Sequence, residues 1–175
     1  VRRHPGKLNY GPAGSGSSPH LAFEAMTGAL GVTATHVPYP GITASLTSIL
    51  GGHLDAVIGA PSNVMAQVRS GQLLALGVSS KERFALTPEL PTMTEQGAPV
   101  DVVTHFGFLA PKGTPVAVMH TLRQALSAAA SDPAYRLAME GMQTQVRLLA
   151  SDAYLQALKA ESDNFAPVIA RLPKK

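Results

Sequence analysis

Short apolar runs alternate with segments of helical period through the first 80 residues of the chain. The apolar runs predict strands at residues 8–10, 32–39, 54–58 and 73–78. Segments whose apolar residues recur at helical spacing predict helices at residues 18–30, 42–50 and 62–69. This alternation favours an α/β fold, with a mostly parallel sheet and helices on both faces, in which ligands bind outside the carboxyl ends of the strands.

The pattern changes after Ser79. Residues 81–96 carry prolines and scattered charges, which indicates an irregular connection with a short helix near residues 92–96. Residues 100–109 are strand-like but interrupted by polar residues and glycine, so they are interpreted as a crossing between two lobes. The remaining pattern predicts a small strand at residues 146–149, helices at about 114–130, at 133–141 and from 151 onward, and a kink at Pro167.

Each of the first three predicted strands ends in a turn that opens a helix, at residues 11–18, 39–41 and 59–63. In a parallel sheet these turns lie at one edge, where helix N-termini present backbone N–H groups and the positive ends of their dipoles. For any single turn, glycine, proline and serine are explained by strand termination alone. Three such turns in succession favour a site for a carboxylate or a phosphate.

Local sequence supports the helix starts. Ser17 and Ser18 can cap the first helix, and Pro19 suits its first turn, where the missing N–H is not needed. Pro61 and Ser62 suit the same two roles at the third helix.

Composition narrows the function classes. The chain has 175 residues, of which 45% are hydrophobic and 14% charged, as is typical of a folded globular protein. The net charge of +3 comes partly from basic residues near both ends, and the few aromatic residues are scattered, which disfavours nucleic-acid binding. No apolar run is long enough to cross a bilayer, and the first residues lack the apolar stretch of a signal peptide.

Metal and cofactor sites are not expected. There is no cysteine, which excludes disulfides, thiolate zinc sites and a cysteine nucleophile, and the six histidines form no metal-binding motif. No third glycine completes a dinucleotide fingerprint after Gly16, and residues 112–114 have the wrong order for a phosphate loop.

A serine hydrolase is the alternative to a binding protein, because a catalytic triad depends on geometry and not on sequence order. Its nucleophile would be Ser15 or Ser17, its base His20 or His36, and its acid Asp55. The residues do not supply a nucleophile elbow, and serines at a helix start usually act as caps. A protein without catalytic residues is therefore favoured.

Several motifs follow one another along nearly the whole chain, at residues 5–11, 13–24, 36–41, 50–55, 71–78, 88–97 and 106–115. Their order, which is more specific than any one of them, resembles that of the Bug family of extracytoplasmic solute receptors. The resemblance implies a periplasmic-binding-protein-like fold of type II that closes on a small carboxylate, such as a dicarboxylate or tricarboxylate. Such a receptor is periplasmic and delivers its solute to the membrane permease subunits of a tripartite tricarboxylate transporter.

The family's ligand contacts are backbone amides and hydroxyls of the strand-to-helix turns, which often act through waters. Carried over to this chain, the ligand-binding residues are Ser15, Gly16, Ser17, Ser18, Tyr39, Gly41, Pro61 and Ser62. The position after Tyr39 is commonly lysine in the family and is Pro40 here, which removes a charge and a backbone donor.

The resemblance also implies that the chain begins where the family's second lobe begins. Residues 1–104 would form that second ligand-binding lobe, and residues 105–175 would return to the first lobe and pack on a partial sheet or on a partner chain. A chain that lacks one wall of its cleft is expected to bind weakly. A remnant that binds no solute and only associates with itself is a third possibility.

Overall fold

A computed structural model of the chain describes residues 7–172, and these form three strands and six helices. Predictions that involve residues 1–6 and 173–175, including the start of the first motif and several basic residues near the ends, lie outside the described residues. None of the described helices is long and apolar enough to cross a membrane.

The sheet consists of three short parallel strands: β1 (Asn9–Pro12), β2 (Thr35–His36) and β3 (Ala56–Ile58). Their order is β2-β1-β3, so that Tyr10 on the central strand lies opposite His36 on one side and Ala56 on the other. The predicted α/β fold with a parallel sheet is confirmed.

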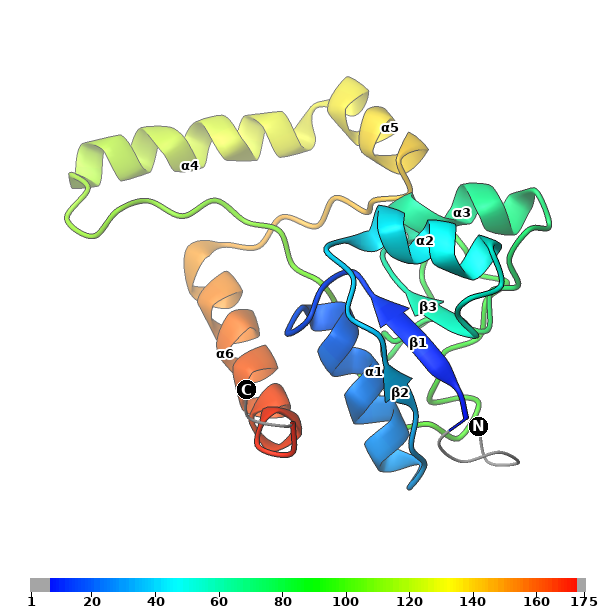
Figure 1. Ribbon diagram of the computed structural model, residues 1–175. Coiled ribbons are helices and arrows are strands. Elements are labelled where there is room, and N and C mark those ends of the chain that lie inside the picture. Colours follow the sequence, from blue (N-terminus) through cyan, green and yellow to red (C-terminus); the bar gives the residue numbers. More distant parts are fainter. Residues whose placement is uncertain (1–6, 173–175) are drawn as a thin grey trace.

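Two helices connect these strands, α1 (Ser18–Ala29) and α2 (Ile42–Leu50), and α3 (Pro61–Arg69) follows the last strand and packs beside α2. The chain moves from β1 to β2 in one direction and then back across β1 to β3. Because crossovers between parallel strands are right-handed, this reversal places α1 on one face of the sheet and α2 on the other (Figure 1). The predicted start of α1 and both predicted ends of α2 agree with the structure.

The predicted fourth strand, residues 73–78, is wrong. Within residues 7–172 this segment makes only an isolated bridge between Val78 and Thr92, and Leu74 and Leu76 are 84% and 64% exposed. The backbone at Gly77 lies close to the carbonyl of Pro91, so the segment pairs with a later loop and not with the sheet. An apolar run becomes a buried strand only where a sheet edge receives its backbone.

Two smaller predictions are also wrong. Residues 146–149 form no strand, and residues 92–96 form a turn and not a helix. That turn is closed by reciprocal hydrogen bonds, since Thr92 N–H donates to the Glu95 carboxylate and Glu95 N–H donates to the Thr92 hydroxyl. The strand-like but interrupted residues 100–109 form no strand either.

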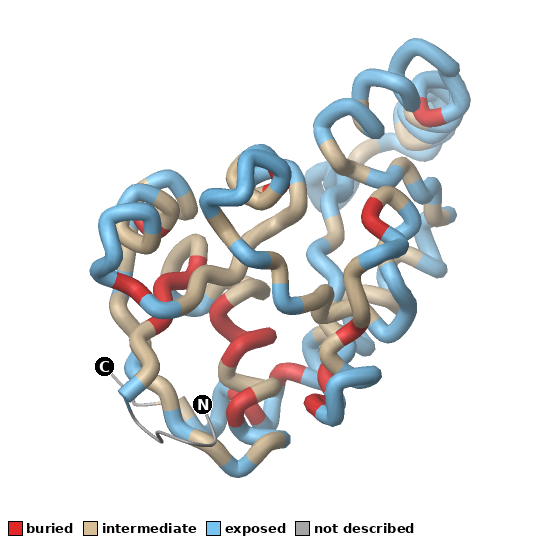
Figure 2. The backbone as a smooth tube through the Cα atoms, turned by 90° about the vertical axis from the view of Figure 1, so that its right-hand side faces the viewer, coloured by how far each residue is buried: buried red, intermediate tan, exposed pale blue. Residues whose placement is uncertain are grey.

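The last three helices divide into an arm and a returning helix. We call α4 (Val116–Ser131) and α5 (Pro133–Gly141) the arm, because they extend away from the sheet, whereas α6 (Ser151–Ile169) lies beside α1 (Figure 1). Buried residues gather in the α/β part, and the arm is almost wholly exposed (Figure 2).

Two apolar contacts hold α1 in place. The Tyr10 and Phe23 rings stack with their centroids 3.8 Å apart, which joins α1 to the central strand. On the outer side of α1, Leu21 packs in a buried cluster with Phe165 and Val168 of α6. The cluster therefore joins the C-terminal helix to the helix that follows the first turn.

We expect Phe165→Ala to lower the free energy of unfolding by about 3–5 kcal/mol, because the ring is 6% exposed and its loss leaves a cavity between α1 and α6. Urea unfolding followed by circular dichroism measures this change. Ile169→Ala is the matched control on the same helix, since Ile169 is 53% exposed and a surface change costs about 0.5 kcal/mol or less. Equal losses for the two variants would contradict the assigned packing.

Candidate functional site

The three predicted turns lie at one edge of the sheet, where the parallel strands end. Because β1 is central, its turn, residues 11–18, lies between the turns that follow β2 and β3. In a sheet of this order the crevice for ligands opens between β1 and β3, where the connections diverge to opposite faces.

Tyr39 and Ser45 join the second turn to the first. A side-chain carbon on Gly11 would lie 3.0 Å from the Tyr39 ring, so only glycine allows this packing. The buried Ser45 hydroxyl on α2 donates to the Pro12 carbonyl at 3.0 Å. The Tyr39 hydroxyl lies 2.5 Å from the Ser48 hydroxyl, so it is hydrogen-bonded within the protein.

Ile42 joins the second turn to the third. A side-chain carbon on Gly59 would lie 2.7 Å from Ile42 Cδ1, at the start of α2. The three turns are therefore in contact through Gly11, Tyr39, Ile42 and Gly59, and the topology has brought together residues about 50 positions apart.

The three helix starts differ in how their N–H groups are used. Ser17 caps α1, since its hydroxyl accepts from His20 N–H, and Pro19 lies in the first turn, both as predicted. Gly41 and Ala60 precede α2 and α3, and neither helix has a side-chain cap. Pro61 begins α3 as predicted, but Ser62 follows it inside the helix, so its predicted capping role is wrong.

Helix starts without a cap leave backbone donors available. The N–H groups of residues 42–44 have no acceptor within residues 7–172. Such donors, together with the positive end of the helix dipole, favour an anion.

The first turn uses part of its own hydrogen-bonding capacity. Gly14 and Gly16 have φ angles of +130° and +79°, which favour glycine. Gly16 N–H donates to His20 Nδ1 at 3.0 Å, and Ser17 N–H donates to the Gly14 carbonyl at 3.3 Å. Among the described residues, the N–H groups of Gly14, Ser15 and Ser18 have no acceptor.

The eight predicted site residues all lie on these three turns or at the helix starts that follow them. Ser15, Gly16 and Ser62 are exposed; the others are partly buried, namely Ser17, Ser18, Tyr39, Gly41 and Pro61. Whether they bind a ligand remains a prediction. The structure adds Glu161 of α6, whose carboxylate accepts from the Ser18 hydroxyl at 3.4 Å. Nothing local in the sequence indicates a contact between residues so far apart.

His20 is the buried polar residue behind the first turn. Its ring stacks on that of His36 with centroids 4.2 Å apart, and its Nε2 lies 3.9 Å from Glu24 Oε1. Burial lowers the pKa of His20 below the ordinary 6.5, His36 lowers it further, and Glu24 opposes the shift. Burial and the hydrogen bond to Glu24 raise the pKa of Tyr10, which therefore stays protonated and donates to Glu24.

The residues of the alternative hydrolase make other contacts. The Ser17 hydroxyl donates to the Gly14 carbonyl at 2.7 Å, and His20 Nδ1 accepts from Gly16. Asp55 accepts from Asn9 N–H at 2.8 Å. No serine, histidine and aspartate are linked by hydrogen bonds into a triad among the described residues.

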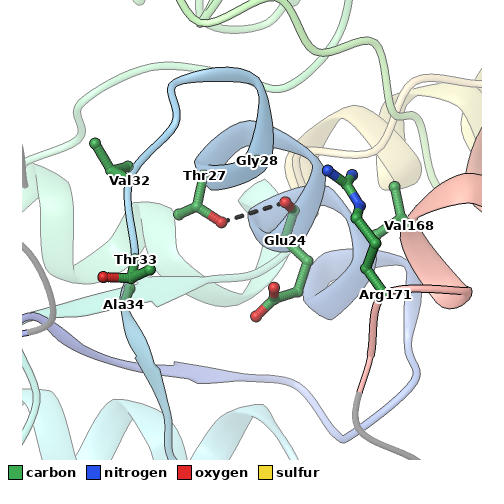
Figure 3. A pocket seen from close by; sticks show the side chains of 8 residues that line it. All are labelled: Glu24, Thr27, Gly28, Val32, Thr33, Ala34, Val168 and Arg171. Atoms are coloured by element: carbon green, nitrogen blue, oxygen red, sulfur yellow. Dashed lines mark hydrogen bonds between the residues drawn. The ribbon is translucent and has the colours of Figure 1, made fainter.

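Two hollows lie away from the three turns. One, of about 210 Å³, is lined by residues of α1, residues 32–34 and α6, and includes Glu24 and Arg171 (Figure 3). It opens at the opposite edge of the sheet, because residues 32–34 precede β2. The other, of about 250 Å³, lies between residues 99–102 and α6. Within residues 7–172 no group of three or more histidine or carboxylate side chains is arranged to hold a metal.

Comparison with known proteins relates the whole chain to one receptor family. The model of the tripartite tricarboxylate transporter family receptor matches residues 1–173. A UPF0065 protein of Bordetella pertussis is 35% identical over 136 residues, which cover 77% of this chain and 42% of the relative. A UPF0065 protein of Cupriavidus necator is 33% identical over 89% of this chain and 47% of its own length. The chain thus spans about half the length of the curated relatives it matches.

Solved structures agree with this relation. MatC of Rhodopseudomonas palustris, solved with bound malate, has a TM-score of 0.83 and 26% identity, over 97% of this chain and 59% of MatC. The periplasmic binding protein BugD has a TM-score of 0.78 and 28% identity, over 98% of this chain and 58% of BugD. The predicted periplasmic-binding-protein-like fold is confirmed.

The free energy of unfolding is expected to fall as the pH is lowered below 6.5. A histidine with a lower pKa in the folded chain binds its proton more readily when unfolded, so acid favours unfolding until native His20 is protonated too. Urea unfolding between about pH 8 and about pH 5 measures this slope. His20→Gln should flatten the slope, whereas His53→Gln, at an exposed position, should retain it. Equal slopes for wild type and His20→Gln would rule out His20 as the cause.

Proposed function

Because the chain belongs to the tripartite tricarboxylate transporter receptor family, we propose that it supplies one wall of a site that holds a small carboxylate solute. The single observation that carries this proposal is the meeting of three strand-to-helix turns at one sheet edge, with α2 and α3 lacking side-chain caps. Backbone N–H groups there suit an anion that is bound reversibly. The family is one of receptors, and no covalent step is assigned.

The site residues other than Gly16 have two kinds of proposed role, either facing the solute or supporting the wall. Ser15 and Ser18 offer backbone N–H groups, and Gly41, Pro61 and Ser62 form the starts of α2 and α3. Ser17 caps α1, and Tyr39 packs on Gly11, so both support the wall. A dicarboxylate is the proposed solute class, and the malate bound by MatC supports it.

The proposed localisation and transport partners of the chain are inferred from its family. We propose that the chain acts in the periplasm and delivers its solute to the membrane permease subunits of a tripartite tricarboxylate transporter. The similarity to the periplasmic protein BugD supports the compartment.

The proposed division of the chain places the second ligand-binding lobe in residues 1–104. Residues 105–175 are proposed to belong to the other lobe, and the exposure of their apolar side chains supports this. Phe106, Phe108, Leu109 and Val116 are each about 80% exposed, at 82%, 81%, 79% and 83%. Where such side chains form a patch, another protein surface usually covers it.

Calorimetric titration with malate, adipate, citrate, aspartate, nicotinate and phthalate tests the carboxylate proposal. We expect weak binding of at least one, because a single wall excludes little water. Submicromolar affinity would contradict the expected weakness. Neither heat nor a thermal shift with any of them at millimolar concentration would contradict the site itself.

Glu161→Gln is expected to raise the affinity for the bound carboxylate about two- to fivefold, the scale of one partly exposed charge pair. The Glu161 carboxylate accepts a hydrogen bond from the Ser18 hydroxyl, so its negative charge repels an anion bound beside Ser18. Glu140→Gln, on the exposed arm, is the charge-matched control and should leave the affinity unchanged. An equal gain in both variants would indicate a general charge effect and not a local contact.

The exposed apolar surface predicts that the isolated chain associates with itself. Size-exclusion chromatography with light scattering should give a mass that rises with concentration, and Phe106→Ser with Phe108→Ser should return it toward the monomer. Leu74→Ser with Leu76→Ser is the matched control, because those exposed leucines lie in the α/β part. A monomeric mass for the wild type at every concentration would contradict the prediction.

A further inference from the structure

One buried side chain bonds to the backbone of the Gly14–Ser18 part of the first turn. Gly16 N–H donates to His20 Nδ1 at 3.0 Å, and His20 is 5% exposed. Gly14 and Gly16 both adopt positive φ, a region that glycine enters as readily as the negative one. The two glycines alone therefore do not fix this conformation, and the bond to His20 acts together with the bonds from Ser17 to the Gly14 carbonyl.

The contact fixes the protonation state of the ring. A backbone N–H can only donate, so Nδ1 must offer a lone pair, and the proton of the neutral ring lies on Nε2. Nε2 lies 3.9 Å from Glu24 Oε1. That same oxygen accepts from the Tyr10 hydroxyl, so a negative charge faces the protonated nitrogen.

The contacts of His20 and Glu24 connect to both ends of the first turn. Tyr10 is fully buried and directly precedes the turn on the strand side, whereas Gly16 lies on the helix side. His20 and Glu24 are four residues apart on α1 and face the same way. Strand, turn and helix are thus joined through one imidazole and one carboxylate.

We propose that His20 is a positioning residue of the carboxylate site, whose neutral imidazole holds the Gly14–Ser18 turn in the conformation that receives the solute. The inference rests on the proposed function and deepens it. The N–H of Gly16 donates to the protein, and the backbone donors left to the solute in this turn are those of Gly14, Ser15 and Ser18.

Protonation of His20 removes the acceptor, because both nitrogens of an imidazolium carry hydrogen. The titratable groups that face the ring are Glu24 on its own helix, Tyr10 on β1 and His36 on β2. Solute affinity should therefore fall as His20 is protonated. A histidine that attracted the solute by its positive charge would have the opposite effect.

Two substitutions distinguish the role of the Nδ1 acceptor from the role of the volume of the His20 ring. His20→Asn places an amide oxygen where Nδ1 stands, so it keeps an acceptor for Gly16 N–H. His20→Leu keeps apolar volume and removes the acceptor. His120→Leu, at an exposed position on the arm, controls for the loss of a histidine.

Three measurements on the full chain test the proposal. Nitrogen-15 NMR of the wild type should find His20 Nδ1 without a proton, and hydrogen exchange should find the Gly16 amide protected in wild type and His20→Asn but not in His20→Leu. Calorimetry with malate should give a roughly fivefold loss of affinity for His20→Leu, the scale of one hydrogen bond. His20→Asn and His120→Leu should remain near the wild type.

A proton on Nδ1, equal Gly16 protection in both His20 variants, or malate affinity that rises on acidification would overturn the proposal. Equal malate affinity for His20→Leu and wild type would do the same. If the wild type binds no carboxylate, the proposed function fails, whereas the NMR and exchange measurements still decide whether His20 holds the turn.

Discussion

The parallel pairing of β1 with both of its neighbours is the constraint on which the rest of this structure depends. Val37 N–H donates to the Tyr10 carbonyl on one side, and Asp55 N–H donates to the Asn9 carbonyl on the other. Because all three strands run the same way, every strand-to-helix turn leaves at one edge and every helix that follows begins there, and α2 does so with backbone donors that have no acceptor within residues 7–172. If one of the three strands ran antiparallel, its turn would leave at the opposite edge, away from the other two.

The backbone conformation of the three turns is stabilised by side chains from neighbouring elements. Glycine permits the required backbone angles but does not favour them, so neighbouring side chains select the conformation. Tyr39 packs on Gly11, Ser45 bonds to the Pro12 carbonyl, and His20 bonds to Gly16. Each of these contacts uses a hydrogen-bonding group or a surface that the solute then cannot use. A solute at this edge can use only those donors that make no hydrogen bond within the protein.

The α/β part and the arm differ in how far they are buried. The α/β part encloses Tyr10, Phe23 and Leu54, whereas the arm and the segment leading to it leave large apolar side chains in contact with water. The chain also spans about half the length of the curated relatives it matches. Both observations fit the proposal that the three turns form one wall of a carboxylate site whose affinity depends on a facing surface, because exclusion of water strengthens each hydrogen bond to a charge.

Local sequence determined the helices, the fold class and the position of the three turns. α2 has its predicted ends because apolar spacing and a following pair of glycines act over a few residues, and Ser17 caps α1 for the same reason. Tertiary structure decided the rest. Residues 73–78 are apolar enough for a strand but lie outside the sheet, Gly16 donates to His20, and Glu161 meets Ser18 across 143 positions. A period or a cap is a property of neighbouring residues, whereas a sheet edge, a buried acceptor or an opposing charge exists only after distant segments have packed together.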